Sequence, residues 1–372
     1  MLYAVLPVYF EDFGLTAIQV GILLSANRWI RLVTNHVAHV ASFHVRPRTL
    51  LLAALSFGTL TTLGYAFTSS FTVLVLARVL WGIAWSFIRH VGVLEVMAHT
   101  PVEAAGRTMG LYNGISRAGT VTGLLGGAAL VDAFGLTAAV VALAGTSAVS
   151  IVLVLRDQGL LRSTARVHAA AARTGDARGH VVFAVLGFSL GIVGGGFVIS
   201  TLGLVLEPYA DEVTLVPGLT AATLTGALLA IRFVLDSAAA PWLGAITDRF
   251  GIRPAATAFF LIGGVALVAA STQPPSLLGM GTLMMAFFVA STSLHSGVAA
   301  SVSRHGSGAY ARYVTAADVG SAAGPLLGWV AVDLLDFAAV GFVMGAVFYL
   351  VSAGMAFRLL RNDQPVPDGS KR

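Results

Sequence analysis

The sequence predicts an all-α polytopic membrane protein, and its composition and its apolar runs are the two observations that predict it. Hydrophobic residues make up 57% of the 372 residues, whereas charged residues make up only 10%. A soluble domain carries about 25% charged residues, so this chain lacks the residues for the polar shell of a soluble fold. Apolar runs near the ~20 residues that span a bilayer recur along the chain, which predicts about eleven full transmembrane helices.

The apolar runs and the turn residues between them place the helices. A short helical stub is expected over 1–10, and ten residues of helix span only about half of the apolar core, so the first helix is expected to be incomplete. The full helices are expected over 15–43, 48–69, 72–98, 106–132, 136–156, 181–206, 217–245, 252–271, 275–302, 308–334 and 337–360.

These helices divide the chain into two bundles. Residues 1–156 form the N-terminal bundle, with the partial first helix and helices two to six, and residues 181–360 form the C-terminal bundle, with helices seven to twelve. The polar stretch 157–180 is expected to be a cytoplasmic linker, and 361–372 a cytoplasmic tail. Because the linker carries several arginines, a helix lying on anionic membrane lipid is the alternative interpretation.

Charge asymmetry predicts the orientation. One set of connections contains acids and no lysine or arginine: Glu11, Asp12, Asp132, Glu207, Glu212, Asp333 and Asp336. The other set holds basic residues: Arg46, Arg48, Arg107, the linker arginines, Arg249, Arg253, Arg304, Arg312, Lys371 and Arg372. Basic loops face the cytoplasm. We expect an integral protein of a bacterial inner membrane, with its C-terminus in the cytoplasm.

Several function classes are excluded. There is no cysteine, so thiol chemistry is absent. No phosphate-binding Gly-x-x-x-x-Gly-Lys-Ser/Thr run appears, so the chain does not hydrolyse ATP to drive a pump. His36, His39, His90 and His295 are not spaced like a metal site; packed or cavity-wall histidines are expected, with a proton shuttle as the alternative. We expect no enzyme activity, no cofactor, no metal and no nucleic-acid partner.

The two bundles repeat each other in sequence. The run from Phe43 to Pro47 corresponds to the run from Phe250 to Pro254. A second set of matches aligns helix five with helix eleven, since Tyr112, Gly119, Gly123, Gly127 and Asp132 correspond to Tyr313, Gly320, Gly324, Gly328 and Asp333. Two parallel six-helix repeats with a ligand site between them is a known transporter plan. The glycines, four residues apart, favour close helix packing, with a hinge as a compatible role.

At this point the chain resembles the major facilitator superfamily. The loop Gly244-Ala-Ile-Thr-Asp248-Arg249-Phe-Gly251-Ile-Arg253 is similar to the family's loop signature. Arg78-x-x-x-Gly82 and Gly320-x-x-x-Gly324-Pro325 resemble the family's elements in helices four and five. The resemblance covers the whole chain and implies the major facilitator fold of two six-helix pseudo-repeats, a monomer, alternating access and a small-molecule substrate.

Within this resemblance, Asp248, Arg249, Gly251 and Arg253 form the gating loop. By pseudo-symmetry, Asp248 is expected to cap the start of helix five near Arg107. Three features depart from the family pattern. The chain begins within helix one; the matching first loop has Val37, Ala41, Ser42 and His44 in place of Gly244, Asp248, Arg249 and Gly251; and Leu124 stands where an antiporter's helix five has proline.

Six arginines lie inside the predicted helices: Arg28, Arg31, Arg78, Arg89, Arg117 and Arg232. A charge at the bilayer centre costs about 3 kcal/mol on insertion scales, so some of them are expected to have a function. Arg28 and Arg31, with Asn27, share a face of helix two. They are expected either to coordinate an anionic group, which suits the guanidinium fork, or to form salt bridges with a neighbouring helix. Arg78 resembles a family position linked to proton coupling.

The embedded acids are Glu95, Asp236 and Asp318. Arg232 and Asp236 are four residues apart and are expected to neutralise each other, with a bound anion or a proton replacing that bond as the alternative. Glu95 is expected to pair with Arg117, with a protonation site as the alternative. Asp318 is the repeat counterpart of Arg117, so a charge pair across the two halves is a further possibility.

The predicted function is secondary active transport. Six embedded arginines against three acids leave a cationic surplus, which favours an anionic or zwitterionic solute, with protons as the expected coupling ion. A proton-coupled exporter of drugs or metabolites is the first alternative. A membrane sensor that has lost transport is the second.

Overall fold

The computed structural model describes residues 1–68, 70–101, 104–156, 177–212 and 220–360. This part of the chain is helical and contains no strand. The elements are α1 (Leu2–Tyr9), α2 (Ala17–Ala41), α3 (Pro47–Gly64), α4 (Phe71–Ala98), α5 (Ala105–Arg156), α6 (Ala177–Leu190), η3 (Gly191–Val198), α7 (Ile199–Leu206), η4 (Glu207–Glu212), α8 (Ala221–Ala238), α9 (Ala240–Phe250), α10 (Ile252–Ser271), α11 (Leu277–Arg304), α12 (Ser307–Leu335) and α13 (Val340–Leu359).

Each expected helix is present, with local corrections. The helices expected over 106–132 and 136–156 are the two arms of α5, which meet at Gly135, where φ is 82° and the backbone is not helical. The helix expected over 217–245 ends at Ala238, and the short α9 follows it up to Phe250. The helix expected over 181–206 is α6, the π-helix η3 and α7 in sequence. Most of the expected linker and the tail lie outside the described residues.

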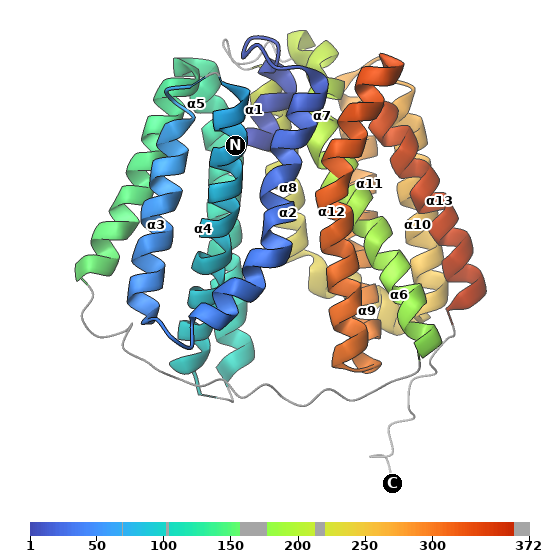
Figure 1. Cartoon of the computed structure of the whole chain (residues 1–372). Helices are drawn as coiled ribbons and strands as arrows, with labels where there is room; N and C mark the ends of the chain where they lie inside the picture. The colour runs from blue at the N-terminus through green and yellow to red at the C-terminus, as the bar shows by residue number, and fades with distance from the viewer. Residues whose placement is uncertain (69, 102–103, 157–176, 213–219, 361–372) are drawn as a thin grey trace.

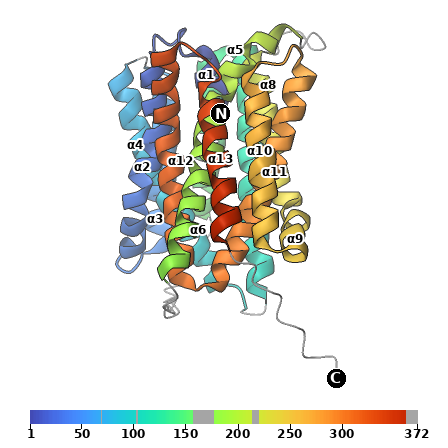
Figure 2. The same ribbon diagram turned by 90° about the vertical axis from the view of Figure 1, so that its right-hand side faces the viewer.

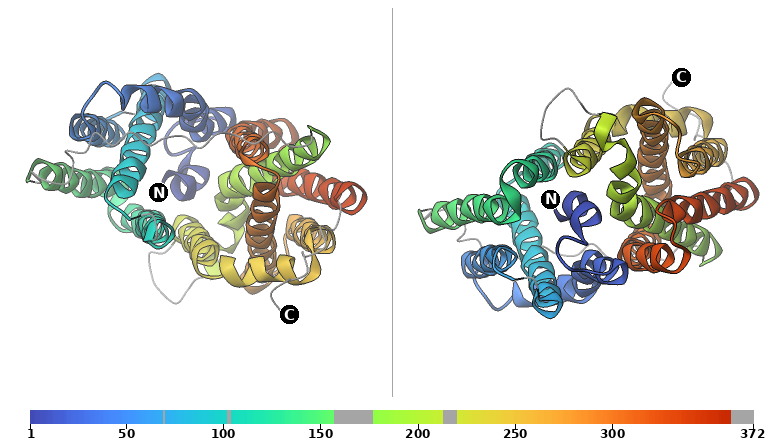
Figure 3. Two further views of the ribbon diagram at one scale, coloured as in Figure 1. Left: turned by 90° about the horizontal axis from the view of Figure 1, so that it is seen from below. Right: turned by 90° about the horizontal axis from the view of Figure 1, so that it is seen from above.

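The helices form two bundles that stand side by side (Figures 1 and 3). The end with Glu11, Asp12 and Asp336 is called the acidic end below, and the end with Arg46 and Arg253 the basic end. The halves meet mainly along two helix pairs, α2 on α12 and α5 on α8, and α1 adds contacts with α7 and α8. The pairing matches the repeat in the sequence: the equivalent helices two, five, eight and eleven build the interface.

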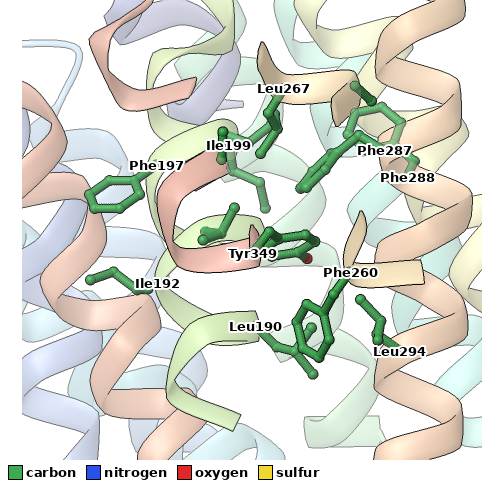
Figure 4. Close-up of a cluster of buried hydrophobic side chains, with 14 of the residues drawn as sticks. Leu190, Ile192, Phe197, Ile199, Phe260, Leu267, Phe287, Phe288, Leu294 and Tyr349 are labelled. Carbon is green, nitrogen blue, oxygen red and sulfur yellow. The ribbon is translucent and has the colours of Figure 1, made fainter. Parts of the chain in front are cut away.

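The largest hydrophobic core lies in the C-terminal half. It joins residues of α6 to α8 with residues of α10, α11 and α13, and its fully buried side chains include Phe197, Phe260, Phe287, Phe288 and Phe342. Figure 2 shows α10, α11 and α13 side by side on this half, and Figure 4 shows part of the cluster. This half is therefore a well-packed support for the residues that face the interface.

The π-helix η3 packs against α12 because both are rich in glycine. A Cβ on Gly196 would lie 2.6 Å from the Gly324 Cα, so the two backbones touch. The glycine stripe of α12 therefore has the close-packing role expected for it. The equivalent stripe of α5 differs, since a Cβ on Gly119 or Gly123 would meet nothing within 4 Å in the described part of the chain.

The two halves are closed against each other only toward the acidic end. On α5, Leu124 and Ala128 are 5% and 0% exposed, whereas Leu111 and Ile115 nearer the basic end are 64% and 65% exposed. From 111 to 119, α5 is exposed around most of its circumference, which happens when a helix has no packed neighbour. On α2, the face that meets α12 near Gly21 continues as exposed side chains at 35, 36 and 39. The interface is therefore open toward the basic end.

Eight spans in the described residues are long and apolar enough to cross a membrane. One of these spans runs from Arg107 to Arg156 and covers both arms of α5. The helices α2 and α3 are not among the eight. For α2 the reason is visible in its sequence, because it carries two arginines, two asparagines and two histidines. A polar helix in such a protein faces an aqueous or protein interior rather than lipid.

Candidate functional site

Two arginines from opposite halves converge on η3 at the centre of the interface. Arg28 Nη1 donates to the carbonyl oxygens of Gly195 and Ser321, the latter at 2.7 Å. Arg232 Nη1 donates to the carbonyl oxygen of Gly194 at 2.6 Å. Two consecutive carbonyl oxygens of the short π-helix therefore accept hydrogen bonds, one from the arginine of α2 in the first half and the other from the arginine of α8 in the second half.

Local backbone features supply these carbonyls. Proline has no N–H, so Pro325 leaves the carbonyl of Ser321, four residues earlier, without its helical hydrogen bond. Arg28 takes that free acceptor. A π-helix shifts the bonding pattern, and such segments occur frequently at functional sites. The glycines also leave room, since a Cβ on Gly195 would come within 3.5 Å of Arg28 Nη1. The Gly-Pro element of α12 and the glycine run of η3 thus position both arginines.

Neither arginine has an acid within ion-pair distance in the described part of the chain. Among the embedded residues, the ion pairs in the described part of the chain are Glu95 with His99 and Arg117 with Asp236. Arg28 lies over the Tyr3 ring at 5.0 Å and Arg232 over the Phe288 ring at 5.8 Å. Arg232 is only 6% exposed. Carbonyl dipoles and ring faces favour a cation, but they leave its full charge uncompensated.

Arg117 and Asp236 connect the halves by charge. Arg117 Nη1 lies 3.7 Å from Asp236 Oδ2, and the hydroxyl of Thr292 donates to Asp236 Oδ1. Both partners are partly exposed, at 43% and 22%. The expected neutralisation of Arg232 by Asp236 is therefore replaced: Asp236 turns to α5 and α11, while Arg232 turns to η3.

The sequence also suggested Glu95 and Asp318 as partners for Arg117, and neither pair is present among the described contacts. Glu95 lies 3.6 Å from His99 on its own helix, not beside Arg117. One carboxylate oxygen of Glu95 is buried without a hydrogen-bond partner among the described residues. Asp318 on α12 is exposed, and it is one of the charges that act on Arg31. Arg31 Nε is buried without a hydrogen-bond partner in the described ranges. Asp318 thus acts across the interface on an arginine of α2.

Arg78 and Asn27 tie α4 to α2. Arg78 Nε donates to the Leu23 carbonyl at 2.7 Å, and its Nη2 donates to Asn27 Oδ1 at 2.9 Å. One turn along, a Cβ on Gly82 would lie 2.6 Å from the Asn27 carbonyl oxygen. The Arg-x-x-x-Gly element therefore locks two helices of the first half together. Arg78 also lines a cavity of about 150 Å³ near the acidic end of this half.

The gating loop has the geometry that its glycine requires. Gly251 has φ 85°, a conformation that other residues rarely adopt. In the matching first loop His44 has no positive φ, so the missing glycine is not needed there. Arg249 lies over the Phe250 ring and Arg253 over the Phe357 ring. The side chain of Asp248 lies outside the described residues, and so does its expected cap on helix five.

Sequence reasoning missed the most connected acid of the interface. Asp132, at the acidic end of the first arm of α5, accepts hydrogen bonds from the backbone N–H and the hydroxyl of Thr220 and of Thr223. It also accepts from the Tyr9 hydroxyl at 2.7 Å. Asp132 therefore caps α8 of the other half. The sequence does carry a signal for this contact: two threonines stand at the start of α8, and an acid stands at the end of helix five.

Comparison with known proteins gives two results. The profile described as Major Facilitator Superfamily matches residues 1–223. Among solved structures, a bacterial homologue of the human lysosomal transporter Spinster, in an inward-facing and occupied conformation, is similar with a TM-score of 0.73 and 15% identity, covering 96% of this chain and 92% of that one. A mutant of the nucleoside transporter NupG is similar with a TM-score of 0.75 and 11% identity, covering 97% and 95%.

No curated protein matches the sequence. Identities of 11% and 15% relate these structures to the chain by fold alone.

Proposed function

The chain belongs to the major facilitator superfamily of secondary transporters, and from that premise we propose that it moves a small anionic or zwitterionic solute in exchange or in symport with protons. It does so as a monomer in a bacterial inner membrane, with the basic end in the cytoplasm, as the positive-inside rule favours. The substrate site lies between the halves, where Arg28, Arg31, Arg117 and Arg232 face η3 and Asp236.

One observation carries the anionic character of the solute. Arg28 and Arg232 keep their full charge in the interior because their hydrogen bonds go to neutral carbonyls. A buried cation without a counter-charge is costly, by several kcal/mol per ion after relaxation. An anionic group of a solute removes that cost and accepts the donors that remain on the guanidinium groups. The site is therefore more favourable with an anion than without one.

The open end of the interface supports alternating access. The halves are closed around Gly21, Ser25 and Asp132 and open beside 35–39 of α2 and 111–119 of α5. With the basic end in the cytoplasm, this is the inward-facing state. A solute exchanges with the cytoplasm through this opening and must wait for the closed contacts to separate before it reaches the other side.

Asp236 supports coupling to protons. It is the partly exposed acid that holds Arg117 across the interface and accepts from Thr292. A proton on Asp236 removes the charge that holds Arg117, which frees that arginine for a second anion contact or for movement of the halves. Glu95 lies nearer the basic end and faces His99 of the same half, and Asp318 acts on Arg31 across the halves but forms no ion pair with it among the described contacts.

The cationic balance disfavours the two alternatives. An exporter of lipophilic cations needs acids in its pocket, whereas arginines dominate this one. Uncompensated charge at the interface between the halves lowers the stability of the protein. A sensor that has lost transport gains nothing in return for that loss.

The experiment is counterflow in proteoliposomes with the solute found in a thermal-shift screen of organic anions against lipophilic cations. Arg28→Ala removes the guanidinium from α2, and the apparent KM for an anionic solute should rise about 10-fold to 100-fold, since a hydrogen bond to a charged group contributes about 1.5–3 kcal/mol. Arg358→Ala, on an exposed position at the basic end of α13, is the matched control. Equal KM values in both variants, or stabilisation by lipophilic cations alone, contradict the proposal.

A further inference from the structure

Three buried polar atoms in the C-terminal half have no hydrogen-bond partner in the described part of the chain. They are Arg232 Nε on α8, Ser291 Oγ on α11 and Tyr349 Oη on α13. The three residues are 6%, 2% and 0% exposed. Unpartnered buried polar groups are rare in native proteins, and three in one place call for a missing partner.

The three groups lie around one point beside Gly194. A Cβ on Gly194 would lie 3.1 Å from Ser291 Oγ and 3.3 Å from Arg232 Nη2, so the guanidinium and the serine hydroxyl face the same side of η3. Ser291 lies close enough to the Tyr349 phenol for the two hydroxyls to interact, and Arg232 and Asp236 act on the phenol as charges. Figure 4 shows Tyr349 between Phe287 and Phe260, inside the hydrophobic cluster.

The backbone carbonyls at this point already have hydrogen-bond partners. The Gly194 carbonyl already accepts from Arg232 Nη1, and the Ser291 carbonyl already interacts with His295 Nδ1. The guanidinium can only donate, whereas each hydroxyl can donate one hydrogen and can also accept. If the two hydroxyls bond to each other, one hydroxyl hydrogen and the Nε hydrogen are still left to place. A water molecule would accept both but would bring two hydrogens of its own and no charge, whereas an anion accepts both and supplies the charge that Arg232 lacks.

The charge around the point is positive. Arg28 and Arg117 repel the positive charge of Arg232, and Asp236 attracts it. Asp236 is engaged by Arg117 and Thr292. The charges of Arg117 and Asp236 offset each other, which leaves Arg232 and Arg28 uncompensated. A low-dielectric interior strengthens the attraction of such a site for a negative charge.

We propose that this point is a binding site for a small monovalent inorganic anion, chloride in the cell, held by Arg232 Nε, Ser291 Oγ and Tyr349 Oη. The ligand is small because residues nearly closed to solvent line the site. Arg232 borders both sites: its Nε faces the chloride, and the transported solute lies toward Arg28 and Arg117 at the interface. Bound chloride neutralises Arg232 and leaves Arg28 as the cation that meets the solute, so the site sets the net charge of the transport site.

Thermal unfolding of the full-length protein in detergent tests the site, with sodium chloride compared with sodium gluconate at equal ionic strength. Chloride should raise the melting temperature by about 3 °C at ten times its Kd, with saturation, because a ligand of the folded state stabilises it by mass action. The double variant Ser291→Ala/Tyr349→Phe should lose this shift. The control Ser301→Ala/Tyr313→Phe, which removes a buried serine and a buried tyrosine hydroxyl elsewhere in the same half, should keep it.

Two further measurements keep the test decisive. Crystals soaked in bromide should show one anomalous peak beside Arg232, even if the double variant folds poorly. Arg28→Ala should keep the chloride shift, which separates this site from the transport site. Equal melting temperatures in chloride and gluconate, an unchanged shift in the double variant, or a shift lost in Arg28→Ala would each overturn the proposal. Loss of solute transport in Arg28→Ala alone leaves it intact.

Discussion

At the scale of single residues, Arg232 and Asp236 are neighbours on one helix face that take different partners. Their i,i+4 spacing favours a direct pair, which would contribute about 0.2–0.5 kcal/mol on an exposed helix. In this interior each finds a stronger arrangement: Arg232 reaches the Gly194 carbonyl, and Asp236 reaches Arg117 and Thr292. The result is a buried cation and a partly exposed acid within one turn, and the proposed function assigns anion binding to the first and proton binding to the second.

Asp236→Asn should separate exchange from coupling. Asparagine keeps an acceptor for the Thr292 hydroxyl but cannot bind or release a proton, so counterflow without a proton gradient should continue while accumulation driven by a pH gradient is lost. Both rates are measured with labelled solute in the same proteoliposomes. Asp333→Asn makes the same charge change at an exposed position of the acidic end and should leave both rates unchanged. Gradient-driven accumulation that survives in Asp236→Asn would move the coupling site to another acid.

The sequence identified the embedded charges but not their partners. The six arginines and three acids could be found because charge inside an apolar run is conspicuous. Which carbonyl or acid each would meet depends on side-chain direction and on free backbone acceptors from other helices. The acceptor of Arg28 illustrates this, since it exists because Pro325 lies four residues beyond Ser321 on a helix distant in the sequence.

At the scale of elements, the contact between α5 and α8 closes the acidic end. Asp132 accepts from the first N–H groups and threonine hydroxyls of α8, where the helix dipole is positive. Close approach lets the contact form, since a Cβ on Gly226 would lie 2.7 Å from the Leu124 carbonyl oxygen. The repeat in the sequence matched α5 with α12, and Asp132 with Asp333. It did not predict this cap, because the equivalent acid in α12, Asp333, is exposed.

Asp132→Asn should weaken closure of the acidic end. The amide loses the charge that the helix start stabilises, a contribution of up to about 2 kcal/mol, so the population open at this end should rise about 10-fold. Because the chain has no cysteine, a single Ser25→Cys label site reports this opening. Ser25 is 2% exposed beside α12. Labelling by a membrane-impermeant maleimide should quicken about 10-fold in Asp132→Asn.

Asp12→Asn is the control for that experiment, because it removes an exposed carboxylate from the same end. It should leave the labelling rate of Ser25→Cys unchanged. Equal labelling rates in Asp132→Asn and Asp12→Asn would show that the cap does not hold this end closed.

At the scale of the whole molecule, function follows from two rigid halves that share one contact face at a time. The C-terminal half is held by a continuous aromatic and aliphatic core, and the first half by ties such as Arg78 to Asn27. Between the halves, apolar packing of Trp329 against α1 and α2 toward the acidic end is joined by polar contacts such as Arg117 to Asp236. Tight packing within each half, and contact between the halves that is concentrated toward the acidic end, favour rocking as rigid bodies.

A disulfide between Ser25→Cys and Ala322→Cys should therefore stop transport. The Ser25 hydroxyl donates to the Ala322 carbonyl across α2 and α12, so two cysteines there are near enough to bridge when the acidic end is closed. Oxidation should abolish counterflow by locking the interface open toward the basic end, and a reductant should restore it. Each single cysteine variant, in a chain with no native cysteine, should be insensitive to oxidant. Normal counterflow by the fully cross-linked protein would mean that the solute crosses without separation of α2 from α12.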